Sequence, residues 1–209
     1  MRVIERHPLW LRIVHWINVP ALLLMIWSGL LIYWANDVYP LFFPDWVYKT
    51  FHLEGRLAQG MAVHFTVAWI LILNGATYLV VSTVRKHWKS LVPTAEELKT
   101  LPDVMLADAG LRPSAKHLLH GEGYNPAQKL AYLGVSFLGL IEILTGFAIY
   151  KPVQLGWLRA VFGGYESARL IHFLAMLGFS AFVLMHVTQV IRAGWNNFRA
   201  MVAGFEVRS

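Results

Sequence analysis

Residues 168–191 read ARLIHFLAMLGFSAFVLMHVTQVI, an almost unbroken run of apolar side chains in which Arg169 is the one Lys, Arg, Asp or Glu residue. A helix rises about 1.5 Å per residue, so about 20 apolar residues cross a hydrocarbon core of about 30 Å. The run also holds His172 and His186, and histidine is costly inside a membrane. It therefore predicts a transmembrane helix that carries a functional site.

Three more runs are long enough to cross a membrane, at about residues 9–34, 57–84 and 127–150. The chain of 209 residues is 57% hydrophobic and 14% charged, whereas a soluble domain is roughly 45–50% apolar and about 25% charged. The sequence thus predicts an all-α integral membrane four-helix bundle. The long connection at about 85–126 contains a short polar run, Thr94–Thr100, which is expected to form one interfacial helix turn or two. The helices and this connection leave no room for a second folded domain, so residues 1–209 are expected to form a single domain.

The first run begins after Arg2 and Arg6, as the apolar part of a signal peptide would. It is longer than the roughly 7–15 residues of such a region and has no small-x-small cleavage site, so we interpret it as a retained membrane helix. The chain has no cysteine. Thiolate-held iron–sulfur clusters, thioether-attached haem and disulfides are therefore excluded, and a redox cofactor must use other ligands.

Basic side chains are distributed unequally between the two ends of the predicted helices. Thirteen of the 18 Lys and Arg residues lie on the side of the termini and of the connection 85–126. The opposite side holds Lys49, Arg56, Lys151, Arg159 and Arg169. Because positively charged loops stay in the cytoplasm, we expect both termini on the cytoplasmic side of the membrane. The net charge of +6 therefore reflects topology and does not indicate nucleic-acid binding.

Four of the nine histidines fall inside the predicted helices, namely His15, His64, His172 and His186. Counted from the helix ends, His15 and His186 lie at one depth near the cytoplasmic side, and His64 and His172 share a depth near the outer side. The 14 residues from His172 to His186 make about 3.9 turns, so both imidazoles leave nearly the same helix face, about 21 Å apart. One helix can thus serve two stacked cofactors.

Pairs of imidazoles suit a haem iron that only carries electrons, because both axial positions are filled and no site remains for oxygen or substrate. Zinc would need four protein ligands, or three and a water, and the two pairs are too far apart in depth to supply them. We therefore expect two b haems whose iron is bound by the four histidines. The other five histidines are expected at the membrane surfaces: His7, His52, His87, His117 and His120.

Haem propionates need cationic partners near the membrane surfaces. Arg12 and Arg6 on the inner side, and Arg56 and Arg169 on the outer side, are candidates. Each of these arginines is equally well explained as an interfacial anchor.

Glu142 places a carboxylate in the middle of its predicted helix. An intramembrane carboxylate is expected either to relay protons or to pair with a polar neighbour such as Asn74 or Ser136, and we favour the pairing.

Several short motifs are spread over nearly the whole chain. They are Arg12-x-x-His15-Trp16, Ser28-Gly29-Leu30, His64, Tyr124-Asn125-x-x-Gln128-Lys129, Thr145-Gly146 and the spacing of His172 and His186. In these motifs the chain resembles the bacterial di-haem cytochrome b family, which includes the gamma subunit of formate dehydrogenase and the cytochromes b of thiosulfate reductase and nickel–iron hydrogenase. The resemblance implies that His64 and His172 ligate the outer haem, and His15 and His186 the inner one.

The resemblance also implies a quinone site near the inner haem, with Asn125 at it and Tyr124, Gln128 and Lys129 as neighbours. Menaquinone or ubiquinone would be the substrate. Asn125 is also a good helix N-cap in front of Pro126, and the two roles are compatible.

As the leading hypothesis, the chain is an electron-transfer subunit that anchors an enzyme complex in the bacterial inner membrane. It carries electrons through the two haems, between a partner enzyme at the periplasmic face and membrane quinone. It has no pterin, nickel or flavin motif, so the substrate chemistry would be performed by partner subunits, such as iron–sulfur or molybdenum-enzyme subunits. The chemistry of this chain itself would be the reduction or oxidation of quinone. Two alternatives remain. One is a stand-alone cytochrome b of the superoxide- or quinone-oxidising kind, and the other is a haem-free transporter whose histidines relay protons.

Overall fold

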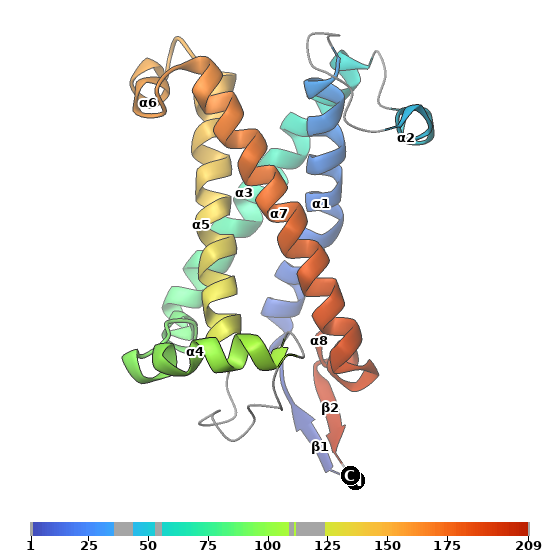
Figure 1. Ribbon diagram of the computed structural model, residues 1–209, viewed down its shortest axis with the longest axis vertical. Coiled ribbons are helices and arrows are strands. Elements are labelled where there is room, and N and C mark those ends of the chain that lie inside the picture. The colour runs from blue at the N-terminus through green and yellow to red at the C-terminus, as the bar shows by residue number, and fades with distance from the viewer. Residues whose placement is uncertain (1, 36–43, 53–55, 109–110, 112–123, 209) are drawn as a thin grey trace. The chain divides into compact units, whose positions relative to one another are not determined.

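Four long helices form the frame of the protein in the computed structural model, which describes residues 2–35, 44–52, 56–108, 111 and 124–208. They are α1 (Leu9–Tyr33), α3 (Leu57–Val84), α5 (Pro126–Tyr150) and α7 (Tyr165–Ala193) (Figure 1). Each is long and apolar enough to span a membrane. The expected all-α class with four membrane-spanning helices is confirmed.

Shorter elements connect and extend the long helices. They are β1 (Arg2–Glu5), α2 (Asp45–Thr50), the 3-10 helix η1 (His87–Ser90), α4 (Ala95–Asp108), α6 (Gly156–Val161), α8 (Trp195–Ala203) and β2 (Phe205–Arg208). The sequence indicated a turn or two near 94–100, where the structure has the 14-residue helix α4. Residues 109–110 and 112–123 of the same connection, with His117 and His120, lie outside the described residues.

The long helices carry apolar side chains on their outer surfaces. Leu73 and Leu79 of α3 and Leu184 of α7 are 64%, 63% and 71% exposed. A helix that is apolar all round is suited to a membrane, where lipid covers such side chains. The exposure therefore agrees with the membrane-spanning assignment.

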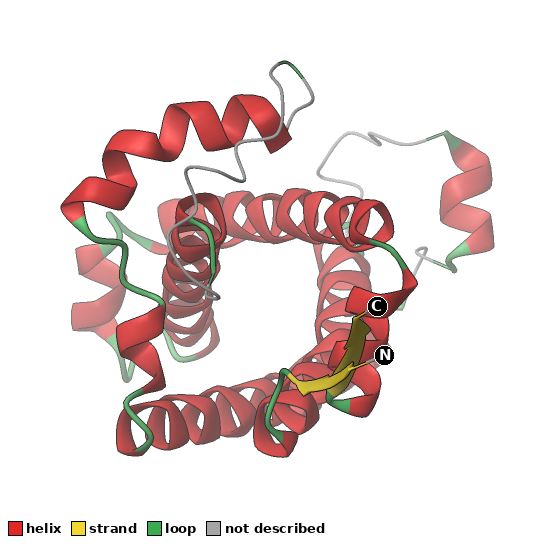
Figure 2. Ribbon diagram, turned by 90° about the horizontal axis from the view of Figure 1, so that it is seen from below, coloured by secondary structure: helices red, strands yellow, loops and turns green. Residues whose placement is uncertain are grey.

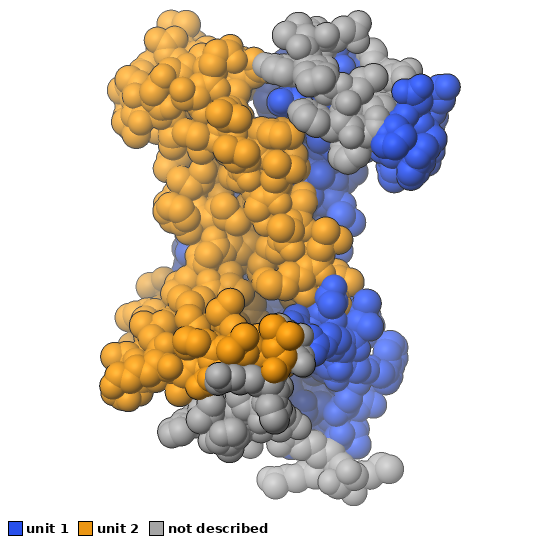
Figure 3. All heavy atoms as spheres, in the orientation of Figure 1, with its two compact units in different colours: residues 1–80, 188–209 blue, residues 81–187 orange. Residues whose placement is uncertain are grey.

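Contacts within the chain divide it into two compact units (Figure 3). Unit 1 comprises Met1–Val80 and Thr188–Ser209, and unit 2 comprises Val81–Val187. Unit 1 thus contains α1 and most of α3, and unit 2 contains α5 and most of α7.

In unit 1, α1 and α3 run antiparallel and are joined by a buried asparagine. Asn74 Nδ2 donates to the carbonyl of Val14 at 2.9 Å and to Asn18 Oδ1 at 2.7 Å. Farther toward the N-terminus of α1, Trp10 packs on Tyr78 with ring centroids 6.1 Å apart. Interhelical hydrogen bonds hold helices together where lipid removes the hydrophobic driving force, so Asn74 fixes this pair.

Close to the start of α3, Gly60 allows α1 to approach. A Cβ at position 60 would lie 2.8 Å from Leu31 Cβ and 3.2 Å from the carbonyl oxygen of Ser28. Leu31 and Ser28 are fully buried. A small residue is therefore required at this crossing.

The two ends of the chain pair as a β ribbon in unit 1 (Figure 2). β1 and β2 are antiparallel, with Val3 opposite Val207. Just beyond β1, Arg6 Nη2 donates to Glu206 Oε1 at 2.8 Å. These strands were not predicted from the sequence, because four residues are too few for a clear period-2 pattern.

In unit 2, α5 and α7 also run antiparallel in close contact. A Cβ at Gly178 would lie 3.2 Å from a methyl group of Leu138. At the other end of the pair, α6 packs against the long helices through the buried side chains of Ala148, Leu158 and Ala168. Small residues thus set the spacing of both helix pairs.

Candidate cofactor site

A serine of α1 orients the ring of His64 in α3. His64 Nδ1 lies 3.0 Å from Ser28 Oγ, which lies 2.6 Å from the carbonyl oxygen of Leu24. A carbonyl only accepts, so the hydroxyl donates to Leu24 and its oxygen accepts from Nδ1–H of His64. The lone pair of Nε2 is then the one offered to a metal. Gly29 makes room for the ring, since a Cβ there would lie 3.4 Å from His64 Cε1.

A threonine of α5 orients His172 of α7 in the same way. His172 Nδ1 lies 2.9 Å from Thr145 Oγ1, which lies 2.6 Å from the carbonyl oxygen of Ile141. The hydroxyl oxygen again accepts from Nδ1–H, which leaves the Nε2 lone pair for a metal. A Cβ at Gly146 would lie 3.4 Å from His172 Cε1.

The two arrangements also repeat in the sequence. Residues 28–33 read SGLLIY and residues 145–150 read TGFAIY, and each oriented histidine is followed by phenylalanine. Ser28 and Thr145 were recognised in the sequence only as motif residues, and their contacts with the histidines were not predicted. The repeated hydroxyl–glycine pair, each before a His-Phe pair, is the signal that would have indicated it.

Glu142 contacts His172, which corrects the expectation that it pairs with Asn74 or Ser136. Its Oε2 lies 2.6 Å from His172 Nδ1. Asn74 bonds to α1, and Ser136 Oγ donates to the carbonyl of Tyr132 in its own helix. Glu142 precedes Thr145 by three residues, so both side chains lie on the same face of α5 and reach the same ring.

His15 and His186 lie farther along the same helices. His15 precedes Ser28 by 13 residues, so it lies about 20 Å along α1 from the level of His64. His186 follows His172 by 14 residues, about 21 Å along α7. Each unit by itself therefore presents imidazoles at two levels about 20 Å apart.

Aromatic side chains lie against the rings of His15 and His186. The ring of Trp16 meets that of His15 edge-on, with centroids 5.3 Å apart. Phe182 stacks on His186, with centroids 5.8 Å apart and an interplanar angle of 11°. Such contacts limit the rotation of an imidazole and give it an apolar surrounding.

The guanidinium of Arg12 has a buried N–H group, at Nε, that is suited to an anionic partner. Its Nη1 donates to the carbonyl of Val202 at 2.7 Å, but Nε is buried and has no hydrogen-bond partner within the described residues. Buried donors are normally paired. Arg12 precedes His15 by three residues, one helix turn away, so a carboxylate of a group bound at His15 would lie within its range.

The other candidate arginines already have partners in the structure. Arg6 pairs with Glu206 in the terminal ribbon. On the exposed surface, Arg56 Nη1 lies 3.5 Å from Gln59 Oε1. Arg169, three residues before His172, pairs with Glu166 at 3.0 Å. The contacts of Arg56 and Arg169 are exposed and exchange readily, so they are compatible with either role considered for these two arginines. The Arg6–Glu206 pair is part-buried.

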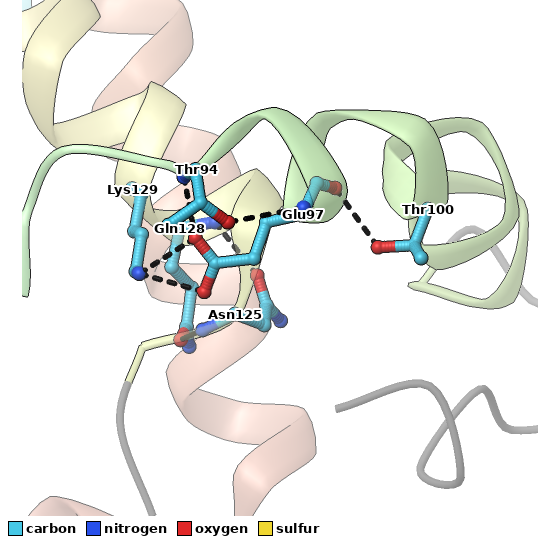
Figure 4. Close-up of polar contacts among 6 residues, drawn as sticks. All are labelled: Thr94, Glu97, Thr100, Asn125, Gln128 and Lys129. Carbon is cyan, nitrogen blue, oxygen red and sulfur yellow. Dashed lines mark hydrogen bonds and ion pairs between the residues drawn. The ribbon is translucent and has the colours of Figure 1, made fainter. Parts of the chain in front are cut away.

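The four residues of the candidate quinone site lie at the start of α5. Gln128 N donates to Asn125 Oδ1 at 2.7 Å, and Asn125 N donates to Gln128 Oε1 at 3.0 Å, which makes a capping box (Figure 4). Lys129 Nζ lies 2.8 Å and 2.9 Å from the two carboxylate oxygens of Glu97 (Figure 4). Three of the four residues thus stabilise the helix start and its contact with α4.

Tyr124, the fourth residue, belongs to a small aromatic cluster. Its ring centroid lies 5.0 Å from that of Tyr132 and 6.3 Å from that of His87. Burial lowers the pKa of His87 below its ordinary value, so this imidazole is neutral at pH 7.

We expect the stability of the contact between α4 and α5 to depend on pH through the carboxyl group of Glu97. The hydrogen bond from Lys129, followed by the backbone N–H of Thr94, lowers its pKa below the ordinary value of 4.5. A lowered folded-state pKa stabilises the contact above pH 4.5, and this stabilisation is lost as the pH falls through the folded-state pKa. In Glu97→Gln, amide hydrogens of α4 should exchange about fivefold faster at pH 7, equivalent to about 1 kcal/mol.

The control for Glu97→Gln is Glu96→Gln, one position away. Glu96 pairs with Lys99, but both side chains are largely exposed. Hydrogen exchange of α4 should therefore stay at the wild-type rate in this variant. Equal rates in both variants at pH 7 would contradict the role assigned to the Glu97–Lys129 pair.

These features fit one class of protein, namely an integral membrane protein of long apolar helices whose oriented imidazoles are suited to a metal-containing cofactor. A haem with its carboxylates fits the apolar helix faces, the Nε2 lone pairs and the buried Nε of Arg12, which has no partner in the described part of the chain. The chain belongs to the prokaryotic cytochrome b561 family, whose model matches residues 6–204. The expected membership of a bacterial cytochrome b family is confirmed.

A curated relative supports the same assignment. The putative protein-methionine-sulfoxide reductase subunit YedZ1 of Azospira oryzae is 35% identical over 185 residues, which cover 88% of this chain and 89% of the relative. The chain is therefore a membrane cytochrome b that binds haem b and transfers electrons.

Proposed function

We propose that residues 1–209 form one transmembrane domain that holds two b haems, one near each membrane surface. His64 and His172 are the ligands of the outer haem, and His15 and His186 those of the inner haem. The observation that carries this proposal is the repeated fixing of Nδ1–H by a hydroxyl oxygen in both units. The equal spacing of the imidazole levels in the two units supports the count of two.

A bis-imidazole haem supplies one-electron oxidation and reduction without an open coordination site. The residues of this chain hold the imidazole planes, as Ser28 and Thr145 do, and offer Nε2 as the ligand atom. Arg12 would donate its Nε–H, which has no partner among the described residues, to a propionate. The lipid-facing helices keep water from the ligands, which stabilises a single coordination state.

We further propose that the chain joins membrane quinone to an oxidoreductase partner at the periplasmic face, with both termini in the cytoplasm. The related protein is named as a subunit of a protein-methionine-sulfoxide reductase, which supports a separate subunit for the substrate chemistry. A reductase consumes electrons, so with such a partner quinol is the electron donor. With an enzyme that oxidises its substrate, whether it holds molybdenum or iron–sulfur clusters, quinone is the acceptor.

The proposed quinone site is at the start of α5, at Asn125 with Tyr124, Gln128 and Lys129 nearby. The amide of Asn125 uses its Oδ1 for the helix cap. Its Nδ2 is the donor group of the same side chain and is chemically suited to a quinone carbonyl. The cap and the quinone contact are therefore compatible.

The haem-to-protein ratio of the purified chain tests the proposal directly. We expect two b haems per chain in a pyridine haemochrome assay, with a reduced-minus-oxidised spectrum of low-spin bis-imidazole type. A ratio of one would contradict the two-level assignment. A high-spin spectrum would contradict ligation by histidine pairs, because an open axial position would then be present.

A further inference from the structure

His172 faces two acceptors at a single ring nitrogen. Glu142 Oε2 lies 2.6 Å from Nδ1, and Thr145 Oγ1 lies 2.9 Å from the same atom. The Thr145 hydroxyl donates to the carbonyl of Ile141 at 2.6 Å, so its oxygen can only accept from the ring. One N–H therefore lies between a hydroxyl oxygen and a carboxylate oxygen.

The contact is partly shielded from solvent. The side chains of His172 and Glu142 are 26% and 19% exposed. Hydrogen bonds to a charged acceptor are shorter and stronger than those between neutral groups, and a low dielectric strengthens them further. The 2.6 Å separation is in the range of such a bond.

The corresponding position of the first helix pair holds a different residue. Glu142 precedes Thr145 by three residues, and Met25 precedes Ser28 by three residues. The hydroxyl and the glycine are repeated in both helices, but the carboxylate stands in α5 alone at this position. The two ligands proposed for the outer haem therefore differ in their surroundings. The helix that contacts His172 has a carboxylate at this position, and the helix that contacts His64 has a methionine.

We propose that Glu142 is a positioning residue that lowers the reduction potential of the haem bound by His172. A carboxylate that accepts Nδ1–H draws the proton toward itself and makes Nε2 more basic. A more basic axial ligand stabilises ferric over ferrous iron, so the one-electron midpoint potential falls. This inference rests on the proposed role of His172 as a haem ligand, and it adds a residue that tunes that haem without touching it.

Redox titration of the purified full-length chain tests the proposal, with Glu142→Gln as the main variant. Glutamine keeps the length and an acceptor oxygen but removes the charge. We expect one haem to become easier to reduce, so that its ratio of reduced to oxidised form at a fixed potential rises about tenfold, which is about 59 mV for one electron. The other haem should titrate as in the wild type.

Three further variants make the result specific. The redox titration of His172→Ala should lack one of the two haem transitions of the wild type. The missing transition identifies the haem that is bound by His172. Glu142→Asp keeps the charge and should shift that haem less than Glu142→Gln does. Ser136→Ala removes a hydroxyl that bonds only within α5 among the contacts described, so both potentials should stay unchanged.

Unchanged potentials in Glu142→Gln, with both haems present, would overturn the inference. Loss of the His172 haem from Glu142→Gln would also overturn it, because the carboxylate would then be needed for binding and not for tuning. If His172→Ala retains the full haem content, the proposed function itself is wrong at this site. These outcomes are distinguished by the haem-to-protein ratio, which is measured on the same samples.

Discussion

Replacing His172 with alanine should reduce the purified chain from two b haems to one. The substitution removes one of two axial ligands and also leaves Thr145 and Glu142 without the ring that they contact. A haem with one imidazole binds more weakly and becomes high-spin, so it is lost on purification. The pyridine haemochrome assay should show half the wild-type haem per protein.

The control for this experiment is His87→Ala. His87 lies in η1, outside the long helices, and its ring contacts Tyr124. We expect this variant to keep two haems. Retention of the full haem content in His172→Ala, or loss of haem from His87→Ala, would contradict the assignment of the ligands.

The second large effect is expected at Gly60, where α1 and α3 cross. In Gly60→Leu, the new Cβ would lie 2.8 Å from Leu31 Cβ and 3.2 Å from the backbone oxygen of Ser28, so the helices must move apart. Overpacking of this kind costs about 1–3 kcal/mol. Separation of the helices also breaks the hydrogen bond between Ser28 and His64, so the haem bound by His64 should be lost with the stability.

Gly134→Leu is the matched control for Gly60→Leu. Gly134 is an exposed residue of α5, and a Cβ there would meet no described atom within 4 Å. The melting temperature and the haem content should both remain at the wild-type level. A normal haem content in Gly60→Leu would show that the approach of α1 to α3 does not position His64.

The sequence predicted the four long helices because each is a long uninterrupted apolar run, and lipid imposes a single length requirement on all of them. The depths expected for the histidines come from counting along these runs. In the structure, His172 and His186 lie 14 residues apart on one continuous helix. Those features depend on local sequence alone.

The contacts of Glu142 and Thr145 with His172 could not be predicted from the sequence, because they depend on which faces of α5 and α7 meet. A rotation of α5 by one residue would have directed Glu142 elsewhere, and apolar side chains on several sides of that helix leave its rotation undetermined by the sequence. The helix α4 was underestimated for a different reason. Thr94 and Glu97 form a capping box that starts it, but its interior contains Pro102.

The ribbon of β1 and β2 has a consequence for the order in which the protein matures. β1 precedes the four spanning helices along the chain, whereas its partner β2 follows them. Because synthesis runs from the N- to the C-terminal side, β1 must wait until these helices have been made before it can pair. The carbonyl of Val202, which accepts from Arg12, also becomes available only after α7. A chain that stops before β2 could insert its helices but would lack the pairing of β1 with β2.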